Sequence, residues 1–309
     1  MSELIVSPGP HIKNKADSVG FEMRDVNLAL IPALGMGLYY FGVNALIVIL
    51  TGMISAMIFE VVMVRIRKRK LQKQDLGSAG LTGLLLAFCV SSATPWWAMA
   101  GGTFIAIVVA KHAFGGLGFN IFNPALLGRA FMLASWPAIM TTWLKPLDAI
   151  TTATPLGLLK EKAISTDLLT MFTGNHAGSI GETCAIALLI GALYLIWRRT
   201  IDLRISLSYI ATVVVMALIF RQDVTFHLLA GGLILGAFYM ATDPVTSPVT
   251  KPGRFVFGFG CGFITMIIRL YGGYPEGVCY SILIMNAVTP LLDRYLQGRI
   301  FGRKKWNTV

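Results

Sequence analysis

Ten stretches of this sequence are almost entirely apolar, and this feature restricts the fold more than any other. They cover residues 27–41, 43–64, 81–92, 96–109, 119–139, 181–197, 205–220, 226–241, 255–270 and 277–292. Only 13% of the 309 residues are charged, about half the charged fraction of a typical soluble domain. A soluble protein of this size needs more charged surface, so the sequence predicts an all-α integral membrane protein with about ten transmembrane helices.

Several of these spans are shorter than the roughly 20 residues with which a straight helix crosses about 30 Å of hydrocarbon. The span 81–92 is the shortest, which favours a broken or re-entrant helix there. Residues 1–25 contain polar and charged groups but lack the apolar region of a cleavable signal peptide. We therefore expect the first span itself to direct insertion into the lipid bilayer.

The net charge of +11 comes largely from clusters of basic residues that flank the apolar spans. The two strongest clusters contain Arg65, Arg67, Lys68, Arg69, Lys70, Lys73 and Arg299, Arg303, Lys304, Lys305. Basic residues beside apolar spans mark cytoplasmic loops, so this charge does not indicate nucleic-acid binding. With ten crossings, the positive-inside rule predicts that both termini are cytoplasmic and that the long loop between the fifth and sixth spans lies on the outer face.

A short internal similarity indicates two halves of five spans each. Residues 83–94 align without gaps on residues 231–242, and a proline follows each segment. The segments are the third span of each half, and an odd number of crossings makes the halves inverted, as in many transporters. The predicted parts are a cytoplasmic segment, a first repeat, an outer loop, a second repeat and a basic cytoplasmic tail. These cover residues 1–25, 26–140, 141–180, 181–296 and 297–309. Chance similarity between apolar helices is the other explanation.

The outer loop contains the segment Asp148-Ala-Ile-Thr-Thr-Ala-Thr154-Pro-Leu. Threonine and aspartate cap helices and bond to their own backbone, so one interpretation is a helix start or a turn. The segment also resembles the flavinylation motif of a family that includes the D subunit of Rnf-type ferredoxin:NAD oxidoreductases and the B subunit of sodium-pumping NADH:quinone reductases. This resemblance implies that a separate flavin transferase joins FMN to Thr154 through a phosphoester. The rest of the implied motif consists of Asp148, Thr151, Thr152, Ala153 and Pro155. Thr151 and Thr152 are the other hydroxyls that could carry the flavin.

The resemblance extends along the whole chain, because residues 7–12, 122–125, 241–248 and 272–277 also resemble family segments, in order. The length fits the Rnf D subunit better than its quinone-reductase relative. The resemblance implies a fold of two inverted five-helix halves similar to a urea transporter, and a second, non-covalent flavin (riboflavin) between helices. It further implies a place in the bacterial cytoplasmic membrane within a complex that couples electron transfer to Na⁺ or H⁺ translocation.

The same resemblance implies partners: other Rnf subunits, including one that carries FMN on the outer face. We expect the NAD and ferredoxin sites on those chains, because this one has neither a GxGxxG unit nor iron–sulfur cysteine spacing. The four cysteines stand singly in or beside apolar stretches, which is typical of buried, inert thiols. Their residues are Cys89, Cys184, Cys261 and Cys279. A solute channel or secondary transporter without a redox cofactor fits the composition equally well, and only the family segments argue against it.

Three charged residues are candidates for cofactor or ion contacts. Arg129 lies in the middle of an apolar span, where charge is usually functional; its partner would be a flavin phosphate or a buried acid, unless the span is shifted and Arg129 snorkels to the interface. Asp243 and Glu276 follow helix breaks and could contact an ion or cofactor, or cap the broken helices. Residues nearer span ends are expected at the membrane interface: Glu60, Lys111, His112 and Arg269. No oxygen cage in the sequence identifies the coupling ion.

Overall fold

The computed structural model describes residues 19–147, 150–162 and 167–297, and most of them are helical. The helices are α1 (Val19–Ile66), α2 (Lys73–Phe88), α3 (Trp96–Phe104), η2 (Ile105–His112), α4 (Pro124–Ser135), α5 (Pro137–Met140), α6 (Pro155–Lys162), α7 (Leu168–Thr173), α8 (Ala185–Arg198), α9 (Leu203–Ile219), α10 (Val224–Leu229), α11 (Leu233–Leu235), η3 (Gly236–Met240), α12 (Lys251–Tyr271) and α13 (Val278–Tyr295). Two short strands, β1 (Trp143–Leu144) and β2 (Thr151–Thr152), pair antiparallel. The helical class predicted from the sequence is confirmed.

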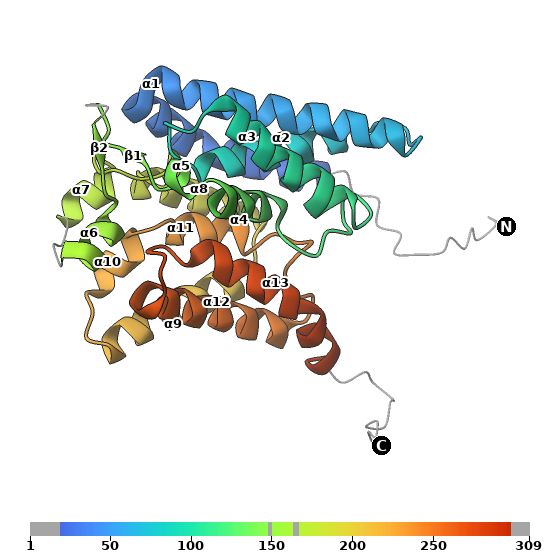
Figure 1. The fold of residues 1–309 in the computed structure, drawn as a ribbon. Coiled ribbons are helices and arrows are strands. Elements are labelled where there is room, and N and C mark those ends of the chain that lie inside the picture. The colour runs from blue at the N-terminus through green and yellow to red at the C-terminus, as the bar shows by residue number, and fades with distance from the viewer. Residues whose placement is uncertain (1–18, 148–149, 163–166, 298–309) are drawn as a thin grey trace, which may run out of the picture.

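Helix α1 consists of two arms that run in opposite directions from a sharp turn (Figure 1). The turn lies at Gly42, whose φ of 58° and ψ of −140° are not helical. A positive φ is readily adopted by glycine because it has no Cβ. The first two predicted spans therefore correspond to the two arms of α1.

Several other predicted spans are interrupted in the structure. The sequence indicated an interruption only for span 81–92. Helix α2 stops at Phe88, in keeping with the broken helix expected there, but it starts eight residues earlier than span 81–92. The prediction of one continuous helix over residues 119–139 was wrong, because the helix starts only at Pro124 and breaks at Trp136 before Pro137. The prediction of one continuous helix over residues 226–241 was also wrong, because α10 and α11 are separate helices.

The second of these breaks has a clear local cause. Gly231 and Gly232 adopt φ values of 63° and 65°, which end α10 and start α11 in a new direction. Two π-helical segments, η2 and η3, follow α3 and α11 directly. Interrupted and π-helical segments inside a bundle often mark functional sites.

Two helices of the described chain are long and apolar enough to cross a membrane. They are Gly20–Ile66, with a mean hydropathy of 2.4 over its most apolar window, and Lys251–Tyr271, with 1.4. Ala185–Arg198 and Leu203–Ile219 are apolar but shorter. The exposed faces of these helices carry large aliphatic side chains such as Val43 and Leu218. The number of ten crossings and the inverted repeat remain predictions.

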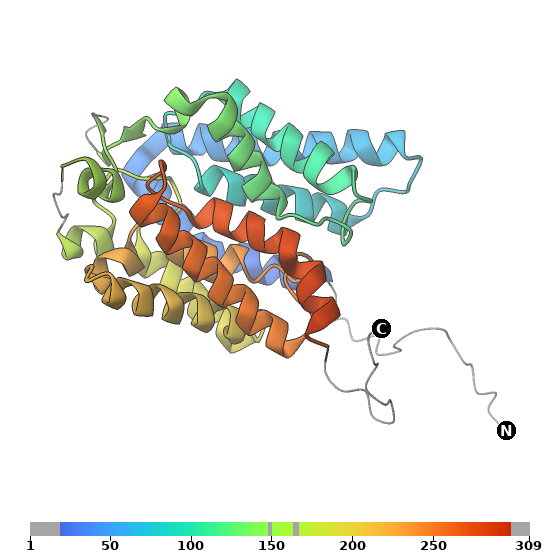
Figure 2. The same ribbon diagram turned by 60° about the horizontal axis from the view of Figure 1, so that its bottom comes forward.

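The bundle has two distinct ends. Helix α1 begins and α13 ends at the same end, whereas β1, β2, α6 and α7 gather at the other (Figures 1 and 2). The first end also holds the basic turns, which are the turns beside Arg198 and Arg254. Arg198 forms an ion pair with Asp25 at 3.0 Å, and Arg254 forms one with Asp202. The long loop and the basic turns thus lie at opposite ends, as the predicted topology requires.

The first half is held together by a close approach of helices at small residues. Gly83 of α2 packs directly on the backbone of Gly52 in α1, and a Cβ on Gly83 would lie 2.9 Å from the Cα of Met53. Such approaches are typical of helix pairs in membranes, where packing rather than water drives association.

We expect Gly83→Ala to lower the stability of the chain by about 1–3 kcal/mol, because the new methyl group meets backbone atoms that cannot move aside. The measurement is thermal unfolding of the purified chain in detergent. Gly77→Ala on the same helix is the matched control, since nothing lies within 4 Å of a Cβ there; it should be neutral or slightly stabilising. Equal unfolding temperatures for the two variants would contradict the close packing.

Candidate functional site

The motif-bearing loop forms a small hairpin. Trp143 pairs with Thr152 and Leu144 with Thr151 across β1 and β2, and the N–H of Lys145 donates to the carbonyl of Ile150 at 2.8 Å. Thr151 and Thr152 are exposed, whereas Trp143 is buried beneath them. Asp148 lies outside the described residues.

Thr154 caps helix α6. Its Oγ1 accepts a hydrogen bond from the N–H of Gly157 at 3.2 Å, and its carbonyl accepts one from Leu158 at 2.8 Å. Pro155 is the first helical residue, a favoured position for proline, and Ala153 is half-buried between the strand and the cap. The sequence interpretation of a helix start is confirmed. An anion attached to this hydroxyl would lie at the N-terminus of α6, where backbone N–H groups favour negative charge.

Helix α6 is fixed to the second half of the chain. Leu156 belongs to a small apolar cluster with Met171, Phe226 and Ala230. On the exposed side, the ammonium of Lys160 donates to the carbonyls of Gly272 and Tyr274. Thr154 is only 7% exposed in this arrangement, so its hydroxyl is held inside the loop.

A buried charge network lies under the helix breaks of this end. Arg129 of α4 forms an ion pair with Glu276, and its Nη1 lies 3.8 Å from Oε1 of Glu182. Arg129 is 6% exposed and stands in the middle of α4. The prediction of a buried acid as its partner is confirmed, and the snorkelling alternative is wrong.

A second arginine completes this network. The guanidinium of Arg269 donates to the carbonyls of His227 at 2.6 Å, Ala230 at 2.7 Å and Glu276 at 3.3 Å. Arg269 is buried within the bundle, where it satisfies the carbonyls freed where α10 ends; its position at the membrane interface remains a prediction. Glu182 was missed in the sequence; its place directly after Gly181, at the start of an apolar span, was the signal that could have indicated it.

Arg129 and Glu276 line a pocket beneath the hairpin, with about 470 Å³ of space between atoms, part of it open to solvent. Trp143, Tyr274 and Tyr280 also line it, and the two tyrosine rings stack at 5.8 Å. The pocket thus combines aromatic surface with a guanidinium and a carboxylate. Such a lining suits a planar aromatic ligand that carries polar edges.

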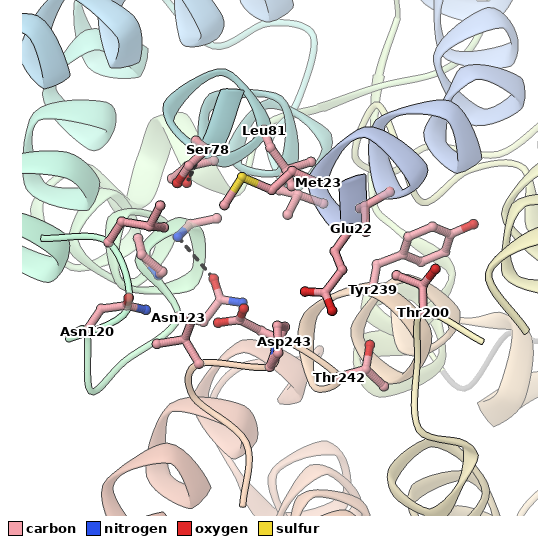
Figure 3. Close-up of a pocket in the computed structure, with 18 of the residues that line it drawn as sticks. Glu22, Met23, Ser78, Leu81, Asn120, Asn123, Thr200, Tyr239, Thr242 and Asp243 are labelled. Atoms are coloured by element: carbon pink, nitrogen blue, oxygen red, sulfur yellow. Dashed lines mark hydrogen bonds between the residues drawn. The ribbon is translucent and has the colours of Figure 1, made fainter. Parts of the chain in front are cut away.

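Asp243 lies elsewhere, in a larger cavity of about 910 Å³ of space between atoms, part of it open to solvent. Its carboxylate accepts a hydrogen bond from Thr246 Oγ1 at 3.0 Å. Figure 3 shows the carboxylates of Asp243 and Glu22 pointing into this cavity, beside Asn123. Of these two pockets, Asp243 lines only the larger one and Thr154 lines neither, whereas Arg129 and Glu276 are brought together beneath the hairpin.

The structure also bears on the predictions for the cysteines and for three other charged or polar residues. The four cysteines are free and buried, as predicted. Glu60, Lys111 and His112 are almost fully buried between helices, and their position at the membrane interface remains a prediction. Within the described ranges, no group of three His, Cys, Asp or Glu side chains could hold a metal ion.

Known proteins resemble this chain over nearly its whole length. The model of the NQR2, RnfD, RnfE family matches residues 5–302. The D subunit of the proton-translocating ferredoxin:NAD(+) oxidoreductase complex of Clostridium ljungdahlii is 48% identical, over 97% of this chain and 96% of the relative. The D subunit of the Na(+)-translocating ferredoxin:NAD(+) oxidoreductase complex of Acetobacterium woodii is 47% identical, over 98% and 96%. The D subunit of the ion-translocating oxidoreductase complex of Stutzerimonas stutzeri is 37% identical, over 94% of each chain.

Proposed function

The chain belongs to the NQR2, RnfD, RnfE family, and from this premise we propose that it is the flavin-carrying membrane subunit of an ion-translocating ferredoxin:NAD oxidoreductase complex. The observation that carries the proposal is the motif that contains Thr154, at the N-terminus of α6. The names of its relatives support it. These two relatives are named for different ions at nearly equal identity, so similarity alone does not select Na⁺ or H⁺.

We propose FMN, joined by its phosphate to Thr154 Oγ1, as the covalent cofactor. When bound, the flavin supplies the redox chemistry. Thr154 would anchor it, and the N–H groups at the start of α6 would favour the negative charge of its phosphate. Arg129 and Glu276 supply polar contacts in the aromatic pocket beneath the hairpin. Because Thr154 is buried, the flavin transferase must reach its hydroxyl before α6 closes against the second half.

Riboflavin is the proposed second flavin, bound without a covalent link. The cavity of Figure 3 supports this, because both polar and apolar side chains line it, as in most ligand pockets. Glu22 and Asp243 supply polar groups there, and Leu81, Leu85 and Phe238 supply apolar surface.

The proposed setting is the bacterial cytoplasmic membrane, with about ten crossings in two inverted, urea-transporter-like halves. Both termini face the cytoplasm and the hairpin faces outward, where an FMN-carrying subunit of the complex would exchange electrons with it. The NAD and ferredoxin sites belong to other subunits. The opposite placement of basic turns and hairpin supports this orientation.

Cysteine labelling in intact cells tests the orientation. Thr152→Cys should react with a membrane-impermeant maleimide added outside, because Thr152 is exposed on the hairpin. Lys68→Cys, exposed at the opposite end, should react only after the cells are opened. The native cysteines are buried and give a low background. Reaction of Lys68→Cys alone in intact cells would reverse the orientation.

Electron transfer by the assembled complex tests the function. We expect membranes with the Thr154→Asn chain to contain the complex but to lose ferredoxin-dependent NAD reduction, because the flavin anchor is missing. Thr151→Ala is the control with normal turnover. A solute channel or secondary transporter needs no anchor, so full activity of Thr154→Asn would overturn the electron-carrier assignment.

A further inference from the structure

A second buried charge cluster lies between α1, α2 and η2, near the basic end of the bundle. The ammonium of Lys111 lies 2.9 Å from Oε2 of Glu60 and 3.0 Å from Oγ of Ser78. Nε2 of His112 lies 3.2 Å from the other carboxylate oxygen of Glu60. Glu60 is 0% exposed, and Lys111 and His112 are 1% exposed. These groups are not part of the proposed flavin site beneath the hairpin.

Helix packing alone does not explain this cluster. A buried ion pair costs desolvation that apolar side chains of equal volume avoid, so it is weak as a device for stability. Charged residues inside a membrane bundle are usually functional. Lys111 and His112 also end the π-helix η2, and π-helical turns often occur at functional sites.

The cluster adjoins the large cavity. Lys111 and Ser78 are both among the residues that line it, together with Glu22 and Asp243, and Figure 3 shows Ser78 at its wall. Lys111 therefore belongs both to the cluster with Glu60 and to the lining of a space that is partly open to solvent. Around the cluster, Arg69 pairs with Asp75 at 2.6 Å and Arg67 donates to the carbonyl of His112.

We propose that Lys111 is a tethered cation, whose ammonium fills a monovalent-cation site formed by Glu60 and Ser78. A carboxylate and a hydroxyl are hard oxygen donors of the kind that Na⁺ prefers over nitrogen or sulfur. Nε2 of His112 lies 3.2 Å from the remaining carboxylate oxygen of Glu60, and neither atom has a hydrogen-bond partner among the described residues. A free cation from the cavity can bind Glu60 only when the ammonium is removed or turns away, so Lys111 decides whether Glu60 is available to ions. This proposal does not depend on the flavin.

Sodium-dependent thermal unfolding of the purified full-length chain tests the proposal. Removing the ammonium in Lys111→Ala should create a Na⁺ site, so the unfolding temperature should be roughly 3 °C higher in about 100 mM NaCl than in choline chloride at equal ionic strength. The unaltered chain, Lys73→Ala and Glu60→Gln/Lys111→Ala should show no such difference. Lys73 is an exposed lysine on α2 and controls for the loss of one positive charge.

The result is decisive even where Lys111→Ala folds poorly. Lys111→Ser is a second variant that leaves room for an ion, and either variant should be recovered in higher yield in NaCl than in choline chloride. A sodium response in Lys111→Ala or Lys111→Ser no larger than in the double variant would overturn the proposal. Failure of both variants to fold in every salt would also overturn it, because Na⁺ should replace the missing charge.

Discussion

Thr154→Asn, produced together with a flavin transferase, is expected to carry no covalent FMN. The phosphoester requires a hydroxyl, and asparagine has none. Asparagine is nevertheless a good helix cap, so its side-chain oxygen can accept the hydrogen bond that Thr154 Oγ1 accepts from the N–H of Gly157, and α6 stays in place. The loss of flavin would therefore report the missing anchor rather than a melted helix.

Flavin fluorescence of the denatured chain in a gel is the measurement. Thr151→Ala and Thr152→Ala should fluoresce like the unaltered chain, since both side chains are exposed on β2 and away from the cap of α6. Fluorescence that persists in Thr154→Asn and disappears in Thr152→Ala would move the attachment to Thr152.

Arg129→Met is expected to lower the free energy of unfolding by about 3–5 kcal/mol, because it leaves the buried Glu182 and the partly buried Glu276 without their counter-charge. Glu276 would lose its ion pair and Glu182 its neighbouring cation. Arg129→Lys should lower the free energy of unfolding by an intermediate amount. Lysine keeps the positive charge but lacks the planar guanidinium group that contacts two acids at once.

The matched control is Arg294→Met, which removes an arginine near the exposed end of α13 and should change stability by less than about 0.5 kcal/mol. Thermal and denaturant unfolding in detergent measure both variants. If Arg129→Met were as mild as Arg294→Met, the buried network would contribute nothing measurable.

The helical class could be predicted because it follows from local composition: an apolar segment in lipid has to satisfy its own backbone. The exact breaks could not. Gly231 and Gly232 break the span 226–241 by adopting positive φ values, whereas other glycines continue helices, such as Gly83 within α2. Only tertiary packing decides between these outcomes.

In the candidate site, too, local features could be predicted from the sequence and long-range contacts could not. Thr154 was predictable because a motif is contiguous in sequence, and its capping role follows from local chemistry. The partner of Arg129 is Glu276, 147 residues away, and the partner of Lys111 is Glu60, 51 residues away. No local pattern encodes such pairs, so the burial of Glu60, Lys111, His112 and Arg269 between helices could not be predicted from the sequence.

Peptide mass spectrometry of the unaltered chain, produced with its flavin transferase, is the decisive test of the proposed covalent cofactor. We expect the peptide that contains Thr154 to gain the mass of one FMN less water, with fragment ions that assign the flavin to Thr154 itself. An unmodified peptide in a preparation where the transferase is active on another substrate would contradict the assignment of this chain as a flavin carrier.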